Sequence, residues 1–330
     1  MPRILVTGGA GYIGSHTVRH LLNAEFEVVV LDDLSAGHLS AIPSEVPLVK
    51  VSLSDRDDLR RVFGYHRPDA VIHFAGSIEA GESMTDPRRF YANNVVNSLN
   101  LVEAVIDQGP IPFVFSSSAA VYGEPDANPI SEDMPKEPTN VYGETKLAFE
   151  RVLMAYDRAY DLRSISLRYF NACGAHPDGS IGPDHLIKTH LITLAMLNAL
   201  GQRNQIEVFG TDYPTPDGTC IRDYIHVEDL ASAHVLALEA LMAGAETTAY
   251  NVGVGRGFSV REVLDSVERV TGRSLNRAIA PRREGDPSAL VADSTRIGIQ
   301  LRWEPAYIEL DDIVATAWHW HSNHPDGFGD

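Results

Sequence analysis

The sequence has little positive charge and little cysteine. Its 330 residues include 27 Lys and Arg against 45 Asp and Glu, so the formal net charge is −18 at pH 7. A field of this sign repels nucleic acid and anionic membranes, and we expect neither as a partner. A phosphorylated ligand would need local arginines to overcome it. The two cysteines, Cys173 and Cys220, have no metal-like spacing and predict free thiols in a reducing compartment.

The sequence also lacks an apolar run that could cross a bilayer. The longest such stretch, near residues 191–200, is far shorter than the roughly 20 residues that a transmembrane helix needs. We see no charged and then apolar leader and no internal repeat. The trailing His319, His321 and His324 have no carboxylate spacing, so we expect them on the surface and expect no metal site. Together these features favour a cytoplasmic enzyme.

A glycine-rich turn near the N-terminus is the clearest motif. An apolar run at residues 4–6, typical of a buried parallel strand, precedes it, and a helix is predicted after it. The glycines are Gly8, Gly11 and Gly14. Unpaired amides at the start of a helix favour a diphosphate. Asp32 ends the next apolar run, where a carboxylate can accept hydrogen bonds from both ribose hydroxyls, so the pattern predicts NAD rather than NADP. Asp33 is either a turn residue or shares this role.

Strand and helix patterns alternate through the first half of the chain, which is typical of an α/β fold with a doubly wound parallel sheet of Rossmann type. Long helices are predicted to start near Asp86 and Asn140. After Asn171 the rhythm becomes irregular. We therefore expect an NAD-binding domain over residues 1–172, with returning strands from the C-terminal half, and a smaller mixed α/β substrate region over residues 173–330.

Tyr142 and Lys146 are four residues apart near the start of a predicted helix and therefore share one face. An ordinary tyrosine is a poor base near pH 7, because its pKa is about 10. An ammonium beside it and a positive nicotinamide ring would stabilise the phenolate. Alone, such a pair is common on helix surfaces. Three serines at residues 116–118, at the end of a predicted strand beside the expected cofactor, favour the catalytic interpretation.

Several motifs together resemble a known family. The segments at residues 8–14, 118–123 and 142–146 are similar to the extended short-chain dehydrogenase/reductase family. Within that family, four further segments resemble the UDP-glucose 4-epimerases; they lie at residues 168–171, 222–227, 280–286 and 318–320. The likeness covers nearly the whole chain. It implies reversible oxidation of a UDP-sugar at C4 by tightly held NAD, rotation of the 4-keto sugar, and return of the hydride, so that UDP-galactose and UDP-glucose interconvert.

The resemblance also implies roles for individual residues. Tyr142 would take the proton from the sugar 4-hydroxyl, with Ser118 hydrogen-bonded to the same oxygen and Lys146 supporting the phenolate. The residues implied in cofactor binding are Gly8, Gly11, Tyr12, Ile13, Gly14, Asp32, Ser52, Leu53, Phe74, Ala75, Gly76, Asn93, Ser116, Tyr142, Lys146 and Phe170. Those implied in substrate binding are Ser118, Tyr142, Asn171, His185, Leu186, Arg222, Arg283 and Asp286. The alternative role of Arg222 is a salt bridge with Asp223 or another neighbour. As in relatives, the helices near Asp86 and Asn140 would form a homodimer interface.

Three features depart from the epimerase pattern. Ser52 stands where an aspartate commonly meets the adenine amino group, and residues 75–79 contain no lysine, although relatives often have one there. These two departures leave open whether NAD co-purifies. Leu290 is intermediate in size between the residues found in hexose-restricted relatives and in those that accept N-acetyl sugars. The substrate could therefore be a UDP-hexose, a UDP-N-acetylhexosamine or a UDP-pentose.

Two other kinds of protein compete with this interpretation. A nucleotide-sugar 4,6-dehydratase tends to carry an Asp-Glu pair just after the active-site serine, where this chain has Ala119 and Ala120. A cofactor-sensing binding protein would have no use for Tyr142, Lys146 and Ser118 together. Both alternatives are therefore disfavoured.

Overall fold

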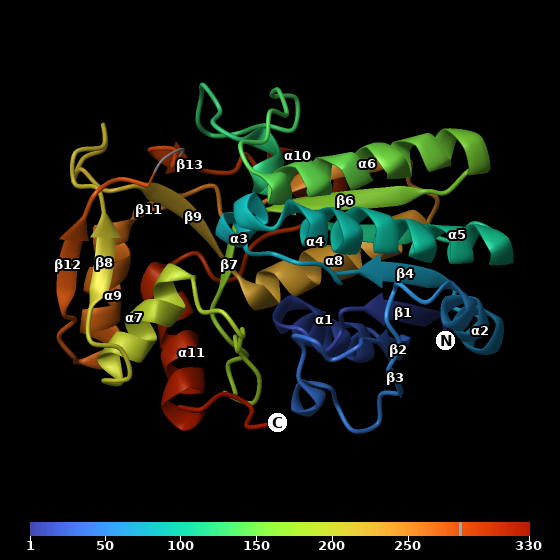
Figure 1. The fold of residues 1–330 in the computed structure, drawn as a ribbon, viewed down its shortest axis with the longest axis horizontal. Coiled ribbons are helices and arrows are strands. Elements are labelled where there is room, and N and C mark those ends of the chain that lie inside the picture. The colour runs from blue at the N-terminus through green and yellow to red at the C-terminus, as the bar shows by residue number, and fades with distance from the viewer. Residues whose placement is uncertain (284–285) are drawn as a thin grey trace.

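The computed structural model describes residues 1–283 and 286–330. Of the motif at residues 280–286, Glu284 and Gly285 lie outside the described residues. Figure 1 shows a larger part built around one broad sheet and a smaller part of short strands and helices beside it. No helix within the described ranges is long and apolar enough to cross a membrane.

Seven parallel strands form the large sheet, in the order β10-β6-β5-β4-β1-β2-β3. They are β1 (Arg3–Thr7), β2 (Glu27–Leu31), β3 (Leu48–Val49), β4 (Ala70–His73), β5 (Phe113–Ser118), β6 (Ser164–Tyr169) and β10 (Thr248–Val252). The strand order changes direction between β1 and β4. In open sheets of this kind a ligand crevice lies at the carboxyl ends of the strands beside such a point. The predicted doubly wound parallel sheet is confirmed.

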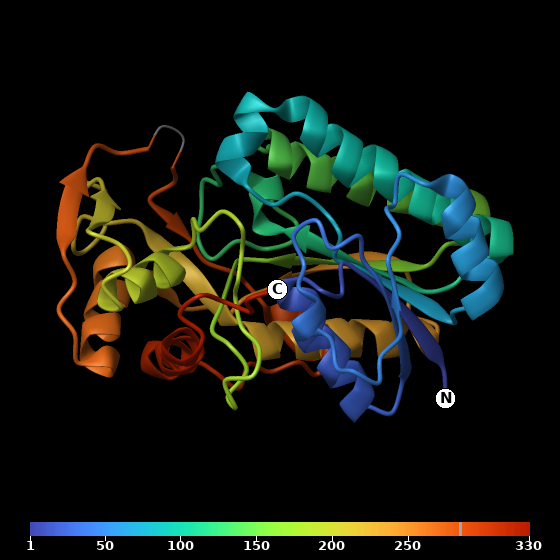
Figure 2. The same ribbon diagram turned by 60° about the horizontal axis from the view of Figure 1, so that its bottom comes forward.

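Helices cover both faces of the sheet, as Figure 2 shows. The helix α1 (Tyr12–Asn23) and α8 (Val227–Met242) lie on one face, and α2 (Arg56–His66), α5 (Ser98–Gln108) and α6 (Val141–Tyr160) lie on the other. Alternate residues of β1 point to opposite faces: Ile4 and Val6 join the core under α1 and α8, and Leu5 joins the core under α2 and α5. Because both faces are buried, the strands are continuous apolar runs.

Two elements of the large part come from late in the chain. β10 pairs in parallel with β6 and extends the sheet at one edge. The helix α8 packs on α1 and on the sheet, where Leu230, Ala233 and Leu238 are buried. The large part therefore includes residues 227–252 as well as most of the first 172.

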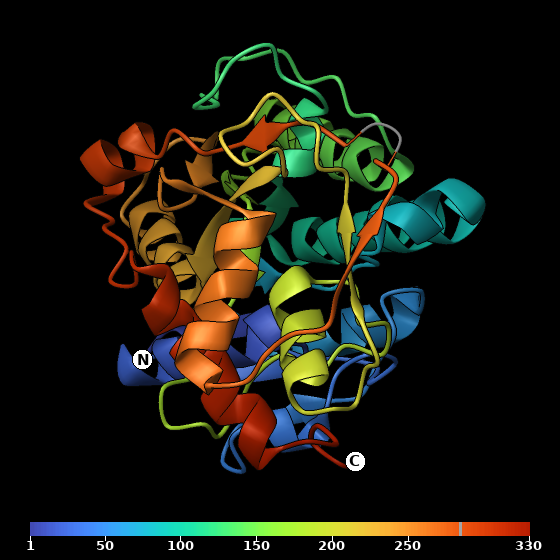
Figure 3. The ribbon, with the colours of Figure 1, turned by 90° about the vertical axis from the view of Figure 1, so that its left-hand side faces the viewer.

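The smaller part has its own core. The strand β9 (Ile221–His226) pairs with β7 (Asn171–Cys173), β11 (Gly257–Ser259) and β13 (Ala289–Leu290), and β8 (Ile206–Phe209) pairs with β12 (Arg277–Ala280). Three helices pack against these strands, α7 (Leu191–Ala199), α9 (Val260–Thr271) and α11 (Leu310–Asn323), as Figure 3 shows. The other short elements are η1 (Leu39–Ala41), α3 (Ala80–Thr85), η3 (Ala119–Tyr122) and α10 (Thr295–Leu301).

The structure corrects two expectations. The long helix predicted from Asp86 is three segments, because a π-helical stretch, η2 (Ala92–Asn97), lies between α4 (Pro87–Tyr91) and α5. Asp86 caps α4 as expected, since its side chain accepts a hydrogen bond from the amide of Arg89. His321 is not on the surface but is buried in α11, because the amphipathic helix turns that residue toward the core.

Candidate active site

The glycine turn between β1 and α1 needs glycine for steric reasons. Gly8 has φ of +72°, and a Cβ there would lie 2.6 Å from the backbone nitrogen of Ala75. A Cβ on Gly14 would lie 2.2 Å from the carbonyl oxygen of Gly8. A Cβ on Gly11, by contrast, would meet only that same oxygen, at 3.3 Å. The backbone at Gly11, which caps α1, is therefore open to close approach by a ligand.

A cavity of about 690 Å³ runs from this turn along the carboxyl edge of the sheet. Every residue predicted to bind the cofactor lines it except Lys146, which is buried behind the wall. The lining residues from that prediction are Gly8, Gly11, Tyr12, Ile13, Gly14, Asp32, Ser52, Leu53, Phe74, Ala75, Gly76, Asn93, Ser116, Tyr142 and Phe170. Segments far apart in the sequence thus meet around one volume.

Asp32 and Asp33 have different surroundings. The two carboxylate oxygens of Asp32 accept hydrogen bonds from the amides of Ala10 and Leu34, at 3.0 and 2.9 Å, and the side chain is buried. Burial raises the pKa of Asp32, although these amides oppose it. Asp33 is exposed and accepts from the amide of Ser35 at 2.9 Å. Asp33 therefore closes a turn, and Asp32 is the fixed carboxylate at the end of β2.

Tyr142 and Lys146 lie on the face of α6 that packs against the end of β5. The ammonium of Lys146 donates to the carbonyl oxygen of Ser116 at 2.8 Å, and its nitrogen lies 5.8 Å from the centre of the Tyr142 ring. Ser118 lines the same cavity as Tyr142, and its hydroxyl oxygen accepts from the amide of Ala120 at 3.1 Å. The structure therefore brings together the three residues that the sequence predicted as catalytic.

Burial controls the protonation of this pair. It raises the pKa of Tyr142, and only the side chain of Ser118 acts in the opposite direction. It also lowers the pKa of Lys146 to about 8, opposed by the charge of Glu150. In the protein alone, desolvation of the phenolate dominates. The expectation that Lys146 and a positive nicotinamide ring together stabilise the phenolate stays a prediction.

A second cavity, of about 270 Å³, adjoins the first. The two share Tyr12, Asn171, Ala172, His185 and His190 in their walls. The predicted substrate residues that line the second cavity are Asn171, His185, Arg222, Arg283 and Asp286. Its arginines supply positive charge that the acidic chain as a whole lacks.

Two predicted substrate residues have surroundings that differ from the expectation. Arg222 forms an ion pair with Asp286 and donates to the carbonyl of Pro287 at 2.8 Å, so its partner is not Asp223. Asp223 instead accepts from three backbone amides. Leu186 is 73% exposed and lies beside the first cavity.

Sequence reasoning missed several lining residues. The hydroxyl of Tyr169 lies 2.9 Å from that of Ser116, and Tyr169 lines the first cavity. Phe209 lines the second cavity, 3.9 Å under the guanidinium of Arg283. His190 lines both cavities. Tyr169 could have been found, because it lies within the motif at residues 168–171, whereas no local pattern marks Phe209 or His190.

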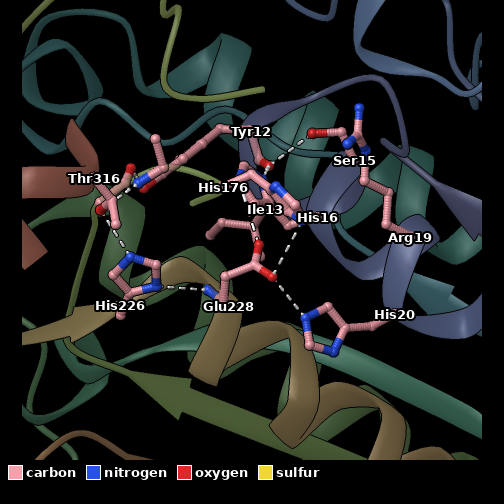
Figure 4. A network of polar contacts seen from close by, with 12 residues as sticks. Tyr12, Ile13, Ser15, His16, Arg19, His20, His176, His226, Glu228 and Thr316 are labelled. Atoms are coloured by element: carbon pink, nitrogen blue, oxygen red, sulfur yellow. Dashed lines mark hydrogen bonds and ion pairs between the residues drawn. The ribbon is translucent and has the colours of Figure 1, made fainter. Parts of the chain in front are cut away.

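A polar network beneath α1 joins the two parts of the molecule, as Figure 4 shows. Glu228, in the first turn of α8, lies 3.0 Å from Nε2 of His20 and 3.7 Å from Nε2 of His16. His226 accepts from the amide of Glu228 at 3.1 Å and lies 2.9 Å from the hydroxyl of Thr316 on α11. This network fixes the helix behind the glycine turn. In the part of the chain that the structure describes, no cluster of His, Cys, Asp and Glu could hold a metal ion.

The residues around the first cavity fit a dinucleotide. Its volume is within the usual range for small-molecule sites. The open backbone at Gly11 and the free amides of the first turn of α1 suit a diphosphate, and Asp32 is placed to accept from ribose hydroxyls. When bound, NAD supplies a reversible hydride acceptor.

Comparison with known proteins agrees with this geometry. The sequence pattern of the NAD dependent epimerase/dehydratase family matches residues 4–253. A UDP-glucose 4-epimerase of Lacticaseibacillus casei is 47% identical over 327 residues, which is 99% of each chain. A Brucella ovis UDP-glucose 4-epimerase in complex with NAD superposes with a TM-score of 0.94 at 46% identity, covering 97% of this chain and 98% of that one.

A third similar protein was solved with a nucleotide sugar. It is a UDP-glucose-4-epimerase of Stenotrophomonas maltophila with bound NAD and formylated UDP-arabinopyranose, with a TM-score of 0.95 at 37% identity over 98% of this chain and 99% of that one. The family match covers more than half of the chain, and the relatives match over nearly all of it. The chain therefore belongs to the NAD dependent epimerase/dehydratase family.

Proposed function

We propose that the protein is a UDP-glucose 4-epimerase, which interconverts UDP-galactose and UDP-glucose with NAD as its cofactor. The observation that carries this proposal is the meeting of two cavities. One is lined by Tyr142 and Ser118 and fits NAD, and the other is lined by arginines. Relatives of the same family, similar over their whole length, are UDP-glucose 4-epimerases.

The proton of the sugar 4-hydroxyl passes to Tyr142. Ser118 would hold the same oxygen and direct it toward the phenol, because its hydroxyl lines the cavity together with Tyr142. Lys146, fixed to the carbonyl of Ser116, offsets the charge that Tyr142 carries while it is deprotonated. When the 4-keto sugar has turned its opposite face toward the cofactor site, Tyr142 returns the proton to the same 4-oxygen.

The substrate residues hold the nucleotide and leave the sugar free to turn. Arg222 and Arg283 line the second cavity and would bind the diphosphate and uridine part of the substrate, with Asp286 accepting from the ribose hydroxyls. Asn171 and His185 line both cavities and would contact the substrate between them. We assign residues 1–172 chiefly to the cofactor and residues 173–330 chiefly to the nucleotide sugar.

The protein would act as a homodimer in the cytoplasm. Large apolar side chains are exposed on neighbouring elements of one side of the molecule: Met84 on α3, Tyr91 on α4, Val96 on η2 and Met154 on α6. Their exposed fractions lie between 44 and 59%. A second copy of the same helices would bury them. Light scattering at micromolar concentration tests this, and a monomer mass would contradict it.

The experiment that tests the function is incubation of the purified protein with UDP-galactose and no added cofactor, with chromatographic separation of the products. We expect UDP-glucose. Product that appears only after NAD is added would point to weak retention of the cofactor, because Ser52 replaces an aspartate and residues 75–79 contain no lysine. No product under either condition would refute the UDP-glucose assignment, and UDP-N-acetylhexosamines and UDP-pentoses would then be compared.

A further inference from the structure

Three consecutive serines at the end of β5 lie against three residues of α6. Ser118 lines the first cavity with Tyr142, and the carbonyl of Ser116 accepts from Lys146 at 2.8 Å. Ser117 donates to a carboxylate oxygen of Glu150 at 2.5 Å. Tyr142, Lys146 and Glu150 are spaced by four residues and therefore follow one another along one face of the helix. Glu150 therefore lies one helical turn beyond Lys146 on the same face of α6.

Glu150 belongs to a buried ion pair. Its side chain is 4% exposed, and Arg168 on β6 donates to both of its oxygens, with distances of 2.9, 3.2 and 2.6 Å. Arg168 also donates to the hydroxyl of Tyr122 at 2.9 Å. A buried carboxylate with this many donors is fixed in position. Glu150 and Arg168 do not line either cavity themselves, but their neighbours on α6 and β5 do.

The effect of Glu150 on Lys146 depends on which other charged groups lie near the ammonium. The titratable groups near Lys146 are Tyr142 and Glu150 from α6 and His73 from β4. His73 is fully buried between the hydroxyls of Thr7 and Ser98, and burial keeps its pKa low, so it carries no charge near neutral pH. Glu150 is then the neighbouring negative charge. It opposes the desolvation that lowers the pKa of Lys146.

We propose that Glu150, held by Arg168 and Ser117, is a positioning residue that keeps Lys146 an ammonium on the carbonyl of Ser116. By doing so it sets the upper end of the pH range in which Tyr142 can exchange its proton. The inference concerns the proton chemistry of the proposed epimerase and rests on that function for its effect on turnover. Its effect on Lys146 is independent of the substrate.

The first measurement is direct titration of Lys146 by NMR of ¹³C-labelled lysine. The chain has only four lysines, Lys50, Lys136, Lys146 and Lys188, so a Lys146→Met variant assigns the signal. Glu150→Gln should lower the pKa of Lys146 by about one pH unit, because no carboxylate one helical turn away then opposes the burial of the ammonium. Glu150→Asp keeps the charge and should restore most of the wild-type value.

The matched control is Glu132→Gln. Glu132 is another buried carboxylate of the same region, which accepts from the amide of Asn251 at 2.9 Å but does not contact α6. Its replacement should lower stability without moving the titration of Lys146. In the epimerase assay, the alkaline limb of kcat should move to lower pH by about one unit in Glu150→Gln and stay in place in Glu132→Gln.

Glu150→Gln leaves the buried guanidinium of Arg168 without its partner and can destabilise the fold. The double variant Glu150→Gln with Arg168→Met removes both charges and avoids this problem. It should shift the pKa of Lys146 in the same direction but by less, because the positive charge of Arg168 is removed as well. An unchanged Lys146 titration in either folded variant, or an equal shift in Glu132→Gln, would overturn the proposal. If the wild-type protein did not epimerise UDP-galactose, the proposed function would fail, while the NMR titration would still decide the role of Glu150.

Discussion

Lowering the pH should destabilise this protein through its buried histidines, and His73 offers the cleanest case. Its ring is fully buried, with Nδ1 2.7 Å from the hydroxyl of Thr7 and Nε2 2.8 Å from that of Ser98. Burial, and then the charge of Lys146, lowers the pKa of His73 from 6.5 to about 3. The unfolded chain therefore takes up a proton near pH 6.5, and the folded protein does not.

The sign and size follow from this difference. Because the folded pKa lies below the unfolded one, the contribution of His73 is fully present above pH 6.5 and is lost as the pH falls toward 3. Between pH 7 and pH 5 the loss from His73 alone is about 2 kcal/mol. His226, His185 and His234 are also buried with lowered pKa values, so the whole protein should lose more than that.

Urea unfolding of wild type and His73→Gln at pH 7 and pH 5 isolates this contribution. Glutamine keeps a donor and an acceptor but does not titrate, so the variant should lose about 2 kcal/mol less than wild type over that interval. His319→Gln on the exposed side of α11 is the control and should follow wild type. The same pH dependence in His73→Gln and wild type would show that His73 is protonated in the fold and would refute the reasoning.

Three further predictions concern the site and the smaller part. Tyr142→Phe should lower kcat by at least about 100-fold while NAD remains bound, measured by product formation and by the cofactor released on denaturation. Gly14→Ala should abolish NAD retention, because its Cβ would lie 2.2 Å from the carbonyl oxygen of Gly8; cofactor content after desalting checks this. Ser259→Ala removes the cap shared with Glu262 and should cost about 1 kcal/mol in thermal unfolding, with activity retained at low temperature.

The large sheet and the cofactor turn could be predicted from the sequence because their signals are local. Apolar runs, a glycine spacing and an acidic residue at the end of β2 all lie within short segments. The capping box of Ser259 and Glu262 at the start of α9 is likewise a local pattern. The π-helical segment η2 could not be predicted, because its residues satisfy the same helical pattern as their neighbours.

The second cavity was harder to predict, since its walls are set by tertiary packing. Arg222 and Asp286 were both named, but their pairing across 64 residues has no local signal. The direction of the pKa shift of Tyr142 also depends on burial, which the spacing of Tyr142 and Lys146 does not reveal. His321 was misplaced for the same reason, since an isolated histidine in a polar helix end gives no sign of which face is covered.

The late position of α8 and β10 in the chain has a consequence for biosynthesis. When the ribosome has made residues 1–172, β6 still has an unpaired edge, because its neighbour β10 has not yet been made. One face of the sheet is also uncovered at that stage, because α8, which packs over Ile4 and Val6 of β1, has not yet been made. The cofactor-binding part therefore cannot reach its final form during the first half of translation, and its folding must wait for residues 227–252.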